Sequence, residues 1–437
     1  MHEVMAEIRE AATDIVNAHL RDPFVTALFK SCFTYSLPKT FQMLNDETAF
    51  VVTGDIPAMW LRDSSCQVRH ILPFVRDIPE ANDVVTAVLR RQMRYIELDP
   101  YANAFNSAPN NAGHHLDSPQ SSPWVWERKY EGDSLAHPFH LGYLMYKMTG
   151  QASWFDDHAR AACHAMMTTI CTEQHHEAQS LYRFTRPDAP VASDTLCRQG
   201  RGPLTVPTGL TWSAFRPSDD ATRFGYNIPG NAFIAVVLGE VSEMLESITD
   251  DQAIVNSARN TRSEILMALD QRGRFLHPEA GLAWWYEVDG RGGSLFMDDA
   301  NIPSLLSLPL LDCCTADDPV YLATRSLVLS PENPYFYSGK YGEGIGSPHT
   351  PPGHVWPLSL CVQGLTAPSA DEQEMVLSQL LRSAATTGVM HESFSCEDPE
   401  VFTRPWFSWA NAMFCELLLS LSGRPVPHPW LDESGHE

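Results

Sequence analysis

The sequence predicts an all-α protein with the architecture of an (α/α)6 toroid, with long active-site loops and few short strands. Apolar residues recur at helical spacing along nearly the whole chain, whereas strand-like runs are few and short. Long segments rich in Pro, Gly, Asn and Asp separate the helices, and loops of this length in a compact domain are usually functional. About a dozen helices arranged as six hairpins would form a toroid, with its short connections at one end and its long loops at the other.

Each predicted helix rests on the spacing of its apolar residues. Two helix ends carry additional local signals: Ser64 and Gln67 have the spacing of a capping box, and Gly150 stands where a C′ glycine would end a helix. The helices are predicted over residues 4–20, 24–41, 64–75, 81–98, 132–148, 155–175, 231–248, 253–269, 301–311, 320–329, 356–365, 371–386 and 406–421. Strands are predicted over residues 49–53, 181–184 and 282–286.

The chain is long enough to bury a large core, with 437 residues of which 44% are hydrophobic. Length alone suggests two or three domains, but barrels of this size often form one. No change of composition marks a linker, so we predict a single catalytic domain over residues 1–437. An α-solenoid is the alternative, but solenoid repeats should resemble one another, and the sequence shows no such repeat.

The charge balance argues against a nucleic-acid partner. The chain has 30 Lys and Arg against 54 Asp and Glu, a net charge of −24, and its densest basic cluster is Arg90, Arg91 and Arg94 on one predicted helix. Binding a phosphate backbone needs a larger basic face. No apolar run approaches the ~20 residues of a membrane-spanning helix, so we predict no membrane partner.

The N-terminus and the cysteines indicate a reduced, cytoplasmic protein. Residues 1–10 are charged and lack the basic start and apolar centre of a signal peptide. The ten cysteines are scattered, mostly in apolar or helical contexts, where a free thiol behaves as a small hydrophobic group. Cys313 and Cys314 are adjacent without a second pair, which is a poor zinc signal.

Residues 53–69 form the most informative segment of the chain. They combine Trp60 with Arg62 and Asp63 just before the predicted helix start at Ser64. A sugar site needs this mixture, because an aromatic face packs on the pyranose C–H groups and charged groups bind its hydroxyls. The structural alternative is a buried Arg62–Asp63 pair that holds a loop under Trp60.

Residues 103–133 repeat the mixture of aromatic and charged side chains, with Trp126 and Glu127 in the second half. His114 and His115 are adjacent, which is too close for a common metal-binding pair on one helix face. We therefore favour hydroxyl-binding or structural roles for these histidines, and we predict no metal site and no cofactor.

Residues 211–230 carry Asp219 and Asp220 among aromatic and cationic side chains. A carboxyl group in apolar surroundings has a raised pKa and stays protonated as an acid. The structural alternative is an acidic turn at the start of a helix.

Two further loops complete the set. Residues 333–350 contain several glycines, but no strand precedes them as in a dinucleotide-binding motif, so we predict a flexible rim loop with His349. Residues 390–411 contain Glu392 followed by Arg404, Trp406 and Trp409. Their structural alternative is a capping glutamate and a core tryptophan pair.

Two acidic positions in separate aromatic-rich loops suit glycoside hydrolysis, in which one carboxylic acid protonates the leaving oxygen and one carboxylate activates water or attacks carbon. The sequence has no G-x-S-x-G elbow, no H-E-x-x-H motif and no Walker-type loop. The absence of these motifs disfavours acyl transfer, zinc hydrolysis and phosphoryl transfer.

Together the loop motifs resemble glycoside hydrolase family 125. The motifs run in order from about residue 50 to residue 415, so the resemblance covers nearly the whole chain. They are T-G-D-I-P-A-M-W-L-R-D-S, P-W-V-W-E-R-K-Y-E-x-D-S, F-R-P-S-D-D-A, S-G-K-x5-G-S-P-H-T-P, M-H-E-S-F and F-T-R-P-W-F-S-W-A-N.

The resemblance implies an (α/α)6 barrel and an exo-acting, inverting, metal-independent α-mannosidase that removes non-reducing terminal α-1,6-linked mannose. The substrate would be an α-mannoside oligosaccharide such as an N-glycan fragment. The family's base is the glutamate of M-H-E, here Glu392, and its acid is an aspartate of R-P-S-D-D. For the acid we favour Asp219, with Asp220 as the fallback. We also predict substrate-binding roles for Trp60, Arg62, Asp63, His115, Trp126, Glu127, Arg216, Asn227, His349 and Arg404.

Two other functions stay open at this point. A toroid that binds sugar without catalysis would keep Trp60 and Arg62 but would not need both carboxylates. A lyase or epimerase on the same toroid would use Tyr or His as the base, for which Tyr226 or His349 is available. An inverting hydrolase instead requires its two carboxyl groups to lie roughly 6.5–9.5 Å apart, and a separation near ~5 Å would favour retention.

Overall fold

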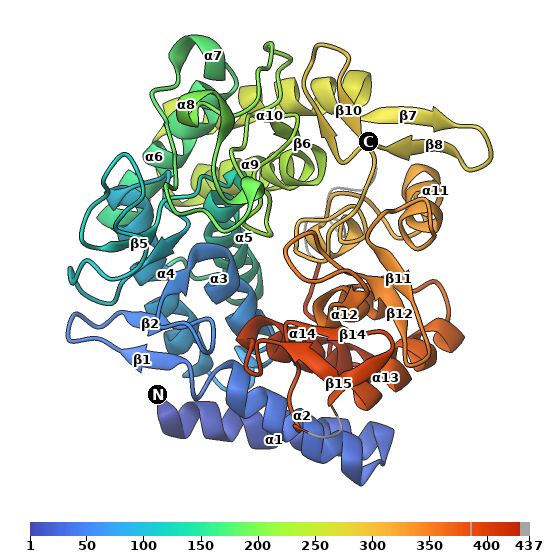
Figure 1. Ribbon diagram of the computed structural model, residues 1–437. Helices are drawn as coiled ribbons and strands as arrows, with labels where there is room; N and C mark the ends of the chain where they lie inside the picture. Colours follow the sequence, from blue (N-terminus) through green and yellow to red (C-terminus); the bar gives the residue numbers. More distant parts are fainter. Residues whose placement is uncertain (385–386, 429–437) are drawn as a thin grey trace.

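The computed structural model describes residues 1–384 and 387–428 as a ring of helices (Figure 1). The inner ring consists of buried helices, and neighbouring members pack side by side from α3 to α5 to α9 and from α12 through α14 back to α3. These inner helices are α3 (Leu61–Arg69), α5 (Gly132–Thr149), α9 (Ile228–Ile248), α12 (Pro357–Leu365) and α14 (Ser408–Leu421). The predicted (α/α)6 class is therefore confirmed.

A second layer of helices surrounds the inner ring. Three of its helices pack on the inner ring: α2 on α14, α10 on α9, and α13 on α12. Two others, α4 and α6, pack on each other. The outer helices are α1 (His2–Leu20), α2 (Pro23–Ser36), α4 (Ala81–Leu98), α6 (Asp157–Glu173), α10 (Gln252–Arg272), α11 (Pro319–Val328) and α13 (Ala370–Ala384). Short helical turns are α7 (His176–Gln179), α8 (Cys197–Gly200), η1 (Leu72–Phe74), η2 (Ala192–Asp194) and η3 (Pro309–Leu311).

The strands are short, antiparallel, and lie between the helices. Pairs are β1 (Phe41–Met43) with β2 (Ala49–Val51), β7 (Arg274–His277) with β8 (Gly281–Trp284), and β11 (Phe336–Ser338) with β12 (Glu343–Ile345). Three-stranded sheets join β3 (Met59–Trp60), β4 (Ala104–Phe105) and β5 (Val125–Glu127); β6 (Tyr226–Asn227), β9 (Glu287–Val288) and β10 (Ser294–Leu295); and β13 (His354–Val355), β14 (Ser393–Ser395) and β15 (Asp398–Thr403).

Each three-stranded sheet is tied to the N-terminus of an inner helix. Strand β3 runs directly into α3, β6 runs directly into α9, and β13 is separated from α12 by Trp356 alone. The sheets thereby bring the long polar loops to the N-terminal ends of the inner helices. That end of the ring carries the candidate site.

The first and last motifs of the chain meet through the backbone. Ser408 N donates to Thr53 O at 3.0 Å, and Asp55 N donates to Trp406 O at 3.3 Å. Gly54 has a φ of 125°, and a Cβ atom there would overlap the Trp406 carbonyl oxygen, so this contact requires glycine. The segment 53–63 is thus joined to the loop 402–409.

Most predicted helices are confirmed, including α4 over its exact residues and α5 with Gly150 in the left-handed conformation at its end. The predicted helix 24–41 instead ends at Ser36, since Pro38 disfavours the helical conformation at Leu37, and Phe41 begins β1. The predicted capping box is wrong, because α3 already begins at Leu61. The Ser64 hydroxyl donates to the Trp60 carbonyl at 2.6 Å, and Gln67 donates to the Val52 carbonyl at 3.0 Å.

The predicted helix 301–311 is also wrong. This buried segment forms turns that end in η3 and lies beside the inner ring, where the Arg69 side chain of α3 donates to the Leu310 carbonyl at 3.2 Å. The Asp298 carboxyl accepts the backbone N–H groups of Leu305 and Leu306 at 2.8 and 2.9 Å. Those donors are therefore directed to a side chain and not along a helix.

Of the predicted strands, the first and third are found as β2 and β8 with shorter ends. Residues 181–184 form no strand; Phe184 N donates to Gly200 O at 3.0 Å, and Thr185 makes one isolated bridge to Ser118.

Among the residues that the structure describes, one helix, α9, is long and apolar enough to cross a membrane by length and composition, but 89% of its apolar window is buried inside the protein. Burial of this kind is expected of a core helix. All ten cysteines are free thiols, and most are buried.

Candidate active site

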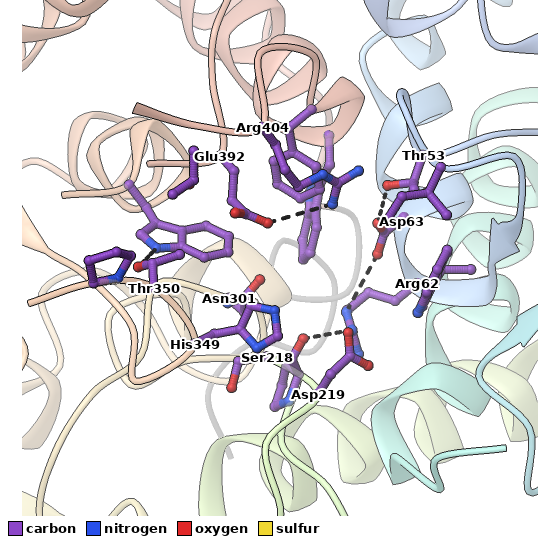
Figure 2. Close-up of a pocket in the computed structure, with 18 residues that line it drawn as sticks. Thr53, Arg62, Asp63, Ser218, Asp219, Asn301, His349, Thr350, Glu392 and Arg404 are labelled. Carbon is purple, nitrogen blue, oxygen red and sulfur yellow. Dashed lines mark hydrogen bonds and ion pairs between the residues drawn. The ribbon is translucent and has the colours of Figure 1, made fainter. Parts of the chain in front are cut away.

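A pocket of about 230 Å³ lies at the N-terminal ends of the inner helices. Four of the five polar segments identified in the sequence contribute to its wall, which makes them one site (Figure 2). The lining residues are Thr53, Ile56, Trp60, Arg62, Asp63, Pro217, Ser218, Asp219, Asn301, His349, Thr350, Pro351, Trp356, Glu392, Thr403, Arg404, Phe407 and Trp409.

Asp219 and Glu392 both line this pocket, and Figure 2 shows them on different sides of it. Asp219 has a left-handed backbone with a φ of 67°, unusual for a residue with a side chain. Its Oδ1 accepts from Asn103 Nδ2 at 2.9 Å, and its carbonyl accepts from Lys129 Nζ at 2.8 Å. These contacts fix a strained residue at the pocket wall, which is typical of functional sites.

Asp220 has a different environment from its neighbour. It is 3% exposed and does not line the pocket. Its Oδ2 accepts from the Ser218 hydroxyl at 3.1 Å and lies 3.8 Å from His349 Nδ1. The structure thus places Asp219, and not Asp220, at the pocket surface.

His349 carries a positive charge at neutral pH. Burial lowers its pKa, but the contact with Asp220 and the nearby carboxylates of Asp219 and Glu392 outweigh burial and raise the pKa to about 9. The predicted rim residue therefore supplies a cation to the pocket wall. The other base considered for a lyase, Tyr226, lies outside the pocket lining and donates to the Val206 carbonyl at 3.0 Å.

Glu392 lies next to a cation that is itself held in place. Its Oε1 is 3.6 Å from Arg404 Nη1, and Arg404 donates from Nε and Nη2 to Asp55 Oδ1 at 2.9 and 2.5 Å. A carboxylate held at the pocket wall in this way is suited to accept a proton from water.

Arg62 is buried with 2% of its surface exposed, and protein groups occupy its hydrogen-bonding fork. Nη1 donates to Glu131 Oε2 at 2.8 Å and to Asp133 Oδ2 at 3.0 Å, while Nη2 donates to the Pro217 carbonyl at 2.6 Å. Its contact with Asp63 is longer, at 3.9 Å. Arg62 is thus buried, as the structural alternative expects, but its main partners are Glu131 and Asp133 and not Asp63, and it links α3 and α5 to the Asp219 loop.

Asp63 keeps its place at the pocket surface. It is 6% exposed, and its Oδ2 accepts from the Thr53 hydroxyl at 2.6 Å. Burial raises its pKa, as the nearby Asp219 does more weakly, against the opposing effects of Arg62 and Thr53.

Aromatic rings line the rest of the pocket. Trp356 donates from Nε1 to the Thr350 hydroxyl at 2.9 Å, and its ring meets Phe407 edge to face at 5.9 Å between centroids. Trp60 packs with Ala58 and Ala104 in a small separate cluster, against which Trp126 also packs. The predicted combination of aromatic faces and charged groups is present.

Five predicted substrate-binding residues do not line the pocket. Asn227 caps α9 by accepting from Gly230 N at 2.8 Å, and Arg216 donates to Glu287 at 2.5 Å. Glu127 accepts from Arg186 at 2.7 Å. Trp126 is half-buried, and His115 is exposed on the loop. Asn227 and Arg216 thus make structural contacts outside the pocket lining.

Sequence reasoning missed several pocket residues. Asn301 lies in the segment mistaken for a helix, and Thr53, Ser218, Thr350, Trp356, Thr403, Phe407 and Trp409 were not singled out as binding residues. Most of them stand within or beside the quoted motifs, so the motifs located the loops, but the inward-facing positions depend on the tertiary structure. Within the described ranges, no cluster of three or more His, Cys, Asp or Glu side chains is arranged to hold a metal ion.

Comparison with known proteins decides the family. The model of the metal-independent α-mannosidases, glycoside hydrolase family 125, matches residues 22–419. The chain belongs to glycoside hydrolase family 125. This chain is also 38% identical to the meiotically up-regulated gene 157 protein of Schizosaccharomyces pombe, over 96% of this chain and 86% of that protein.

Solved structures agree with this assignment. A metal-independent α-mannosidase of Streptococcus pneumoniae, in a non-productive complex with α-1,6-mannobiose, is 43% identical and superposes with a TM-score of 0.93 over 95% of this chain and 98% of that one. A bacterial glucoamylase complexed with acarbose shares 14% identity and a TM-score of 0.61, over 94% of this chain and 58% of that one. The latter likeness concerns the fold alone.

Proposed function

We propose that this family 125 chain is an exo-acting α-1,6-mannosidase that hydrolyses the non-reducing terminal mannose of mannosides or N-glycan fragments with inversion. The observation that carries the proposal is the placement of Asp219 and Glu392 on different sides of one small pocket. Family membership and the α-1,6-mannobiose in the related pneumococcal structure favour mannose as the sugar.

In the proposed reaction Asp219 is the general acid and Glu392 is the general base. Asp219 donates its proton to the glycosidic oxygen as the bond from that oxygen to the anomeric carbon breaks. Glu392 accepts a proton from water as the water oxygen bonds to the same carbon from the opposite face. A direct displacement of this kind inverts the anomeric configuration. Solvent then takes the proton from Glu392 and returns one to Asp219.

The pocket supports action at a chain end. Its volume of about 230 Å³ is below the roughly 300–1,000 Å³ typical of drug-sized ligand sites, so it suits a single sugar ring. Asp63 and Arg404 line the pocket, and we expect them to bind sugar hydroxyl groups, while the rings of Trp356, Phe407 and Trp409 offer apolar faces. Arg62 contributes by fixing Asp63 and the Asp219 loop more than by contacting sugar.

Two further expectations accompany this proposal. A net charge of −24 favours an uncharged glycan over a nucleic-acid partner, and the activity as proposed needs no membrane. Cytoplasmic localisation also stays a proposal, testable by fractionating cells that express the full-length protein.

The decisive experiment presents the protein with α-1,2-, α-1,3- and α-1,6-linked mannobiose. Proton NMR during turnover identifies the first anomer released. We expect preferential cleavage of the α-1,6 linkage with β-mannose appearing first. Initial release of α-mannose would exclude the inverting mechanism, and no mannose from any substrate would exclude the proposed activity.

A further inference from the structure

A second buried carboxyl group, Glu131, lies beside the Asp219 loop. Glu131 is the residue that precedes α5 and is 1% exposed. Its Oε2 accepts from Arg62 Nη1 at 2.8 Å and from the Ser134 hydroxyl at 2.7 Å. Its Oε1 is buried and has no hydrogen-bond donor from the described residues.

Arg62 brings Glu131 and the Asp219 loop together, because it donates from Nη1 to Glu131 Oε2 at 2.8 Å and from Nη2 to the carbonyl of Pro217, two residues before Asp219, at 2.6 Å. Each of the two carboxyl groups acts on the pKa of the other. Two ionised carboxylates in one buried site repel each other, because both are acceptors and both are negative. Asp219 Oδ1 is already occupied by Asn103. A proton between the two acids would supply the donor that Glu131 Oε1 lacks.

The charges around the pair also require a proton. Carboxyl groups outnumber the cations packed against it, and Arg62 alone is shared among Glu131, Asp133 and Asp63. The ionisable groups that act on the pair are Arg62, Asp63, Lys129, Asp133 and His349. Removing several negative charges from water without matching cations is costly, and such a site neutralises one of them.

We propose that Glu131 and Asp219 share a single proton at the pH of turnover, and that Glu131 is the positioning residue that keeps this proton available to the general acid. This inference rests on the proposed role of Asp219. In the reaction an O–H bond of the pair breaks, and the proton bonds to the leaving glycosidic oxygen. Both carboxyl groups are then ionised, and their repulsion draws one proton back from solvent.

Electrostatics agree with a proton held by the pair and not by Asp219 alone. Burial raises the pKa of Glu131 well above its usual range, and the Asp219 charge adds to this effect against the influence of Arg62. Burial also opposes ionisation of Asp219, but Lys129, Arg62, His349 and the interaction with Glu131 lower the pKa of that carboxyl. Asp219 by itself therefore releases a proton readily, and Glu131 is the member of the pair that retains it. Coupled sites of this kind titrate as a unit.

The test is the variant Glu131→Gln, assayed for kcat/KM against pH on α-1,6-mannobiose. A glutamine keeps the shape but cannot hold the shared proton, so the alkaline limb should move to lower pH by ~1 unit or more. At neutral pH kcat/KM should fall by ~10-fold or more, up to the ~10²–10⁴-fold that general acid catalysis contributes. A 2,4-dinitrophenyl α-mannoside, whose leaving group needs no proton, should lose only a few-fold.

Glu240→Gln is the matched control, because Glu240 is fully buried on α9 and bonded to His140 at 3.0 Å, outside the pocket lining. It should leave the pH profile unchanged. If the folded Glu131→Gln protein keeps the wild-type alkaline limb, or loses kcat/KM equally on both substrates, the proposal of a shared proton is wrong. Wild-type release of mannose tests the proposed function separately.

Infrared spectroscopy of the wild-type protein covers the case in which Glu131→Gln does not fold. At neutral pH a protonated carboxyl stretch should be present and should shift on Ser134→Ala, because that change removes the 2.7 Å donor to Glu131. Absence of the band, or a band insensitive to Ser134→Ala, would contradict the proposal.

Discussion

The acidic side chains in and beside the pocket have the same chemical group but different surroundings. Glu392 faces the Arg404 guanidinium, whereas Asp219 faces Asn103 and the buried Glu131. Asp220 is turned toward Ser218 and His349. Separate environments let the same chemical group serve as acid, base or structural anchor.

At Glu392, replacement by Gln should reduce kcat by ~10²–10⁴-fold, the usual contribution of general base catalysis, because the amide cannot accept a proton from water. Binding of mannobiose should stay nearly unchanged, since the shape is preserved. Steady-state kinetics with calorimetric titration measures both. Glu397→Gln, on an exposed turn near β14, is the control that should retain full turnover. Turnover of Glu392→Gln within a few-fold of wild type would rule out its role as the base.

At His349, thermal stability should depend on pH. Its pKa of about 9 lies above the ~6.5 of an unfolded histidine, so its contribution to stability is complete below pH ~6.5 and disappears as pH rises through about 9. The difference in Tm between wild type and His349→Gln should therefore shrink across this range. His115→Gln, on an exposed loop, should show no such trend. A constant difference from pH 6 to pH 10 would show that folding does not raise the pKa of His349.

At the scale of elements, the pocket is built where inner helices begin. Asp63 and Asp133 lie in the first turns of α3 and α5, and Glu131 directly precedes α5. The positive end of a helix dipole stabilises negative charge at these positions. Short sheets then bind the connecting loops to the helix starts, so the acidic groups converge on one end of the ring.

The packing of α5 depends on a glycine inside the helix. A Cβ atom at Gly142 would overlap the indole ring of Trp154, which is fully buried. Glycine to alanine in a helix is ordinarily favourable by ~0.5–1 kcal/mol. Here Gly142→Ala should instead lower the free energy of unfolding by ~1–3 kcal/mol, as overpacked cores do.

Denaturant unfolding measures this loss, and the double variant with Trp154→Phe supplies the control. The smaller ring should relieve most of the clash, so Gly142→Ala should cost less in the Trp154→Phe background. Equal costs in both backgrounds would show that the clash with Trp154 is not the cause.

At the scale of the whole molecule, the ring is closed by contacts between the last inner helix and the first. Arg69 at the end of α3 donates to Glu416 of α14 at 3.1 Å, to His140 of α5 at 3.3 Å and to the Leu310 carbonyl at 3.2 Å. One guanidinium thus connects four segments that are far apart in the sequence. Because Arg69 binds all of these segments, they should lose their packing together when the protein unfolds.

Arg69→Ala should destabilise the protein by ~3–5 kcal/mol, because it leaves the buried Glu416 without its cation. Arg94→Ala removes a more exposed ion pair with Asp46 and should cost only ~0–1 kcal/mol. The comparison of the two unfolding free energies is the measurement. Similar losses for both variants would mean that Arg69 does not hold the ring together.

Heating should reveal one cooperative unit if residues 1–437 form a single domain, as the sequence predicts. We expect circular dichroism, intrinsic fluorescence and mannosidase activity to be lost in one coincident transition. Two resolved transitions would contradict the single-domain prediction. Glu392→Gln should unfold at nearly the wild-type temperature, which would separate loss of chemistry from loss of fold.

The sequence by itself determined the helical class, most helix positions, the family and the loops that carry chemistry. These features are local: helical periodicity, the glycine after α5 and the contiguous motifs are all written in neighbouring residues. It failed at residues 301–311, where the Asp298 side chain takes two backbone donors and Arg69 of α3 binds the Leu310 carbonyl. It also failed at Ser64, because the helix already begins at Leu61.

Only the tertiary structure decided which polar residues face the pocket. Asp219 and Asp220 are adjacent and chemically identical, yet the left-handed backbone at Asp219, held by Asn103 and Lys129, sends them to different surroundings. Arg62 has the appearance of a sugar-binding residue in sequence but is occupied by Glu131 and Asp133. Side-chain direction and charge pairing depend on residues that are distant in the chain, so local motifs cannot specify them.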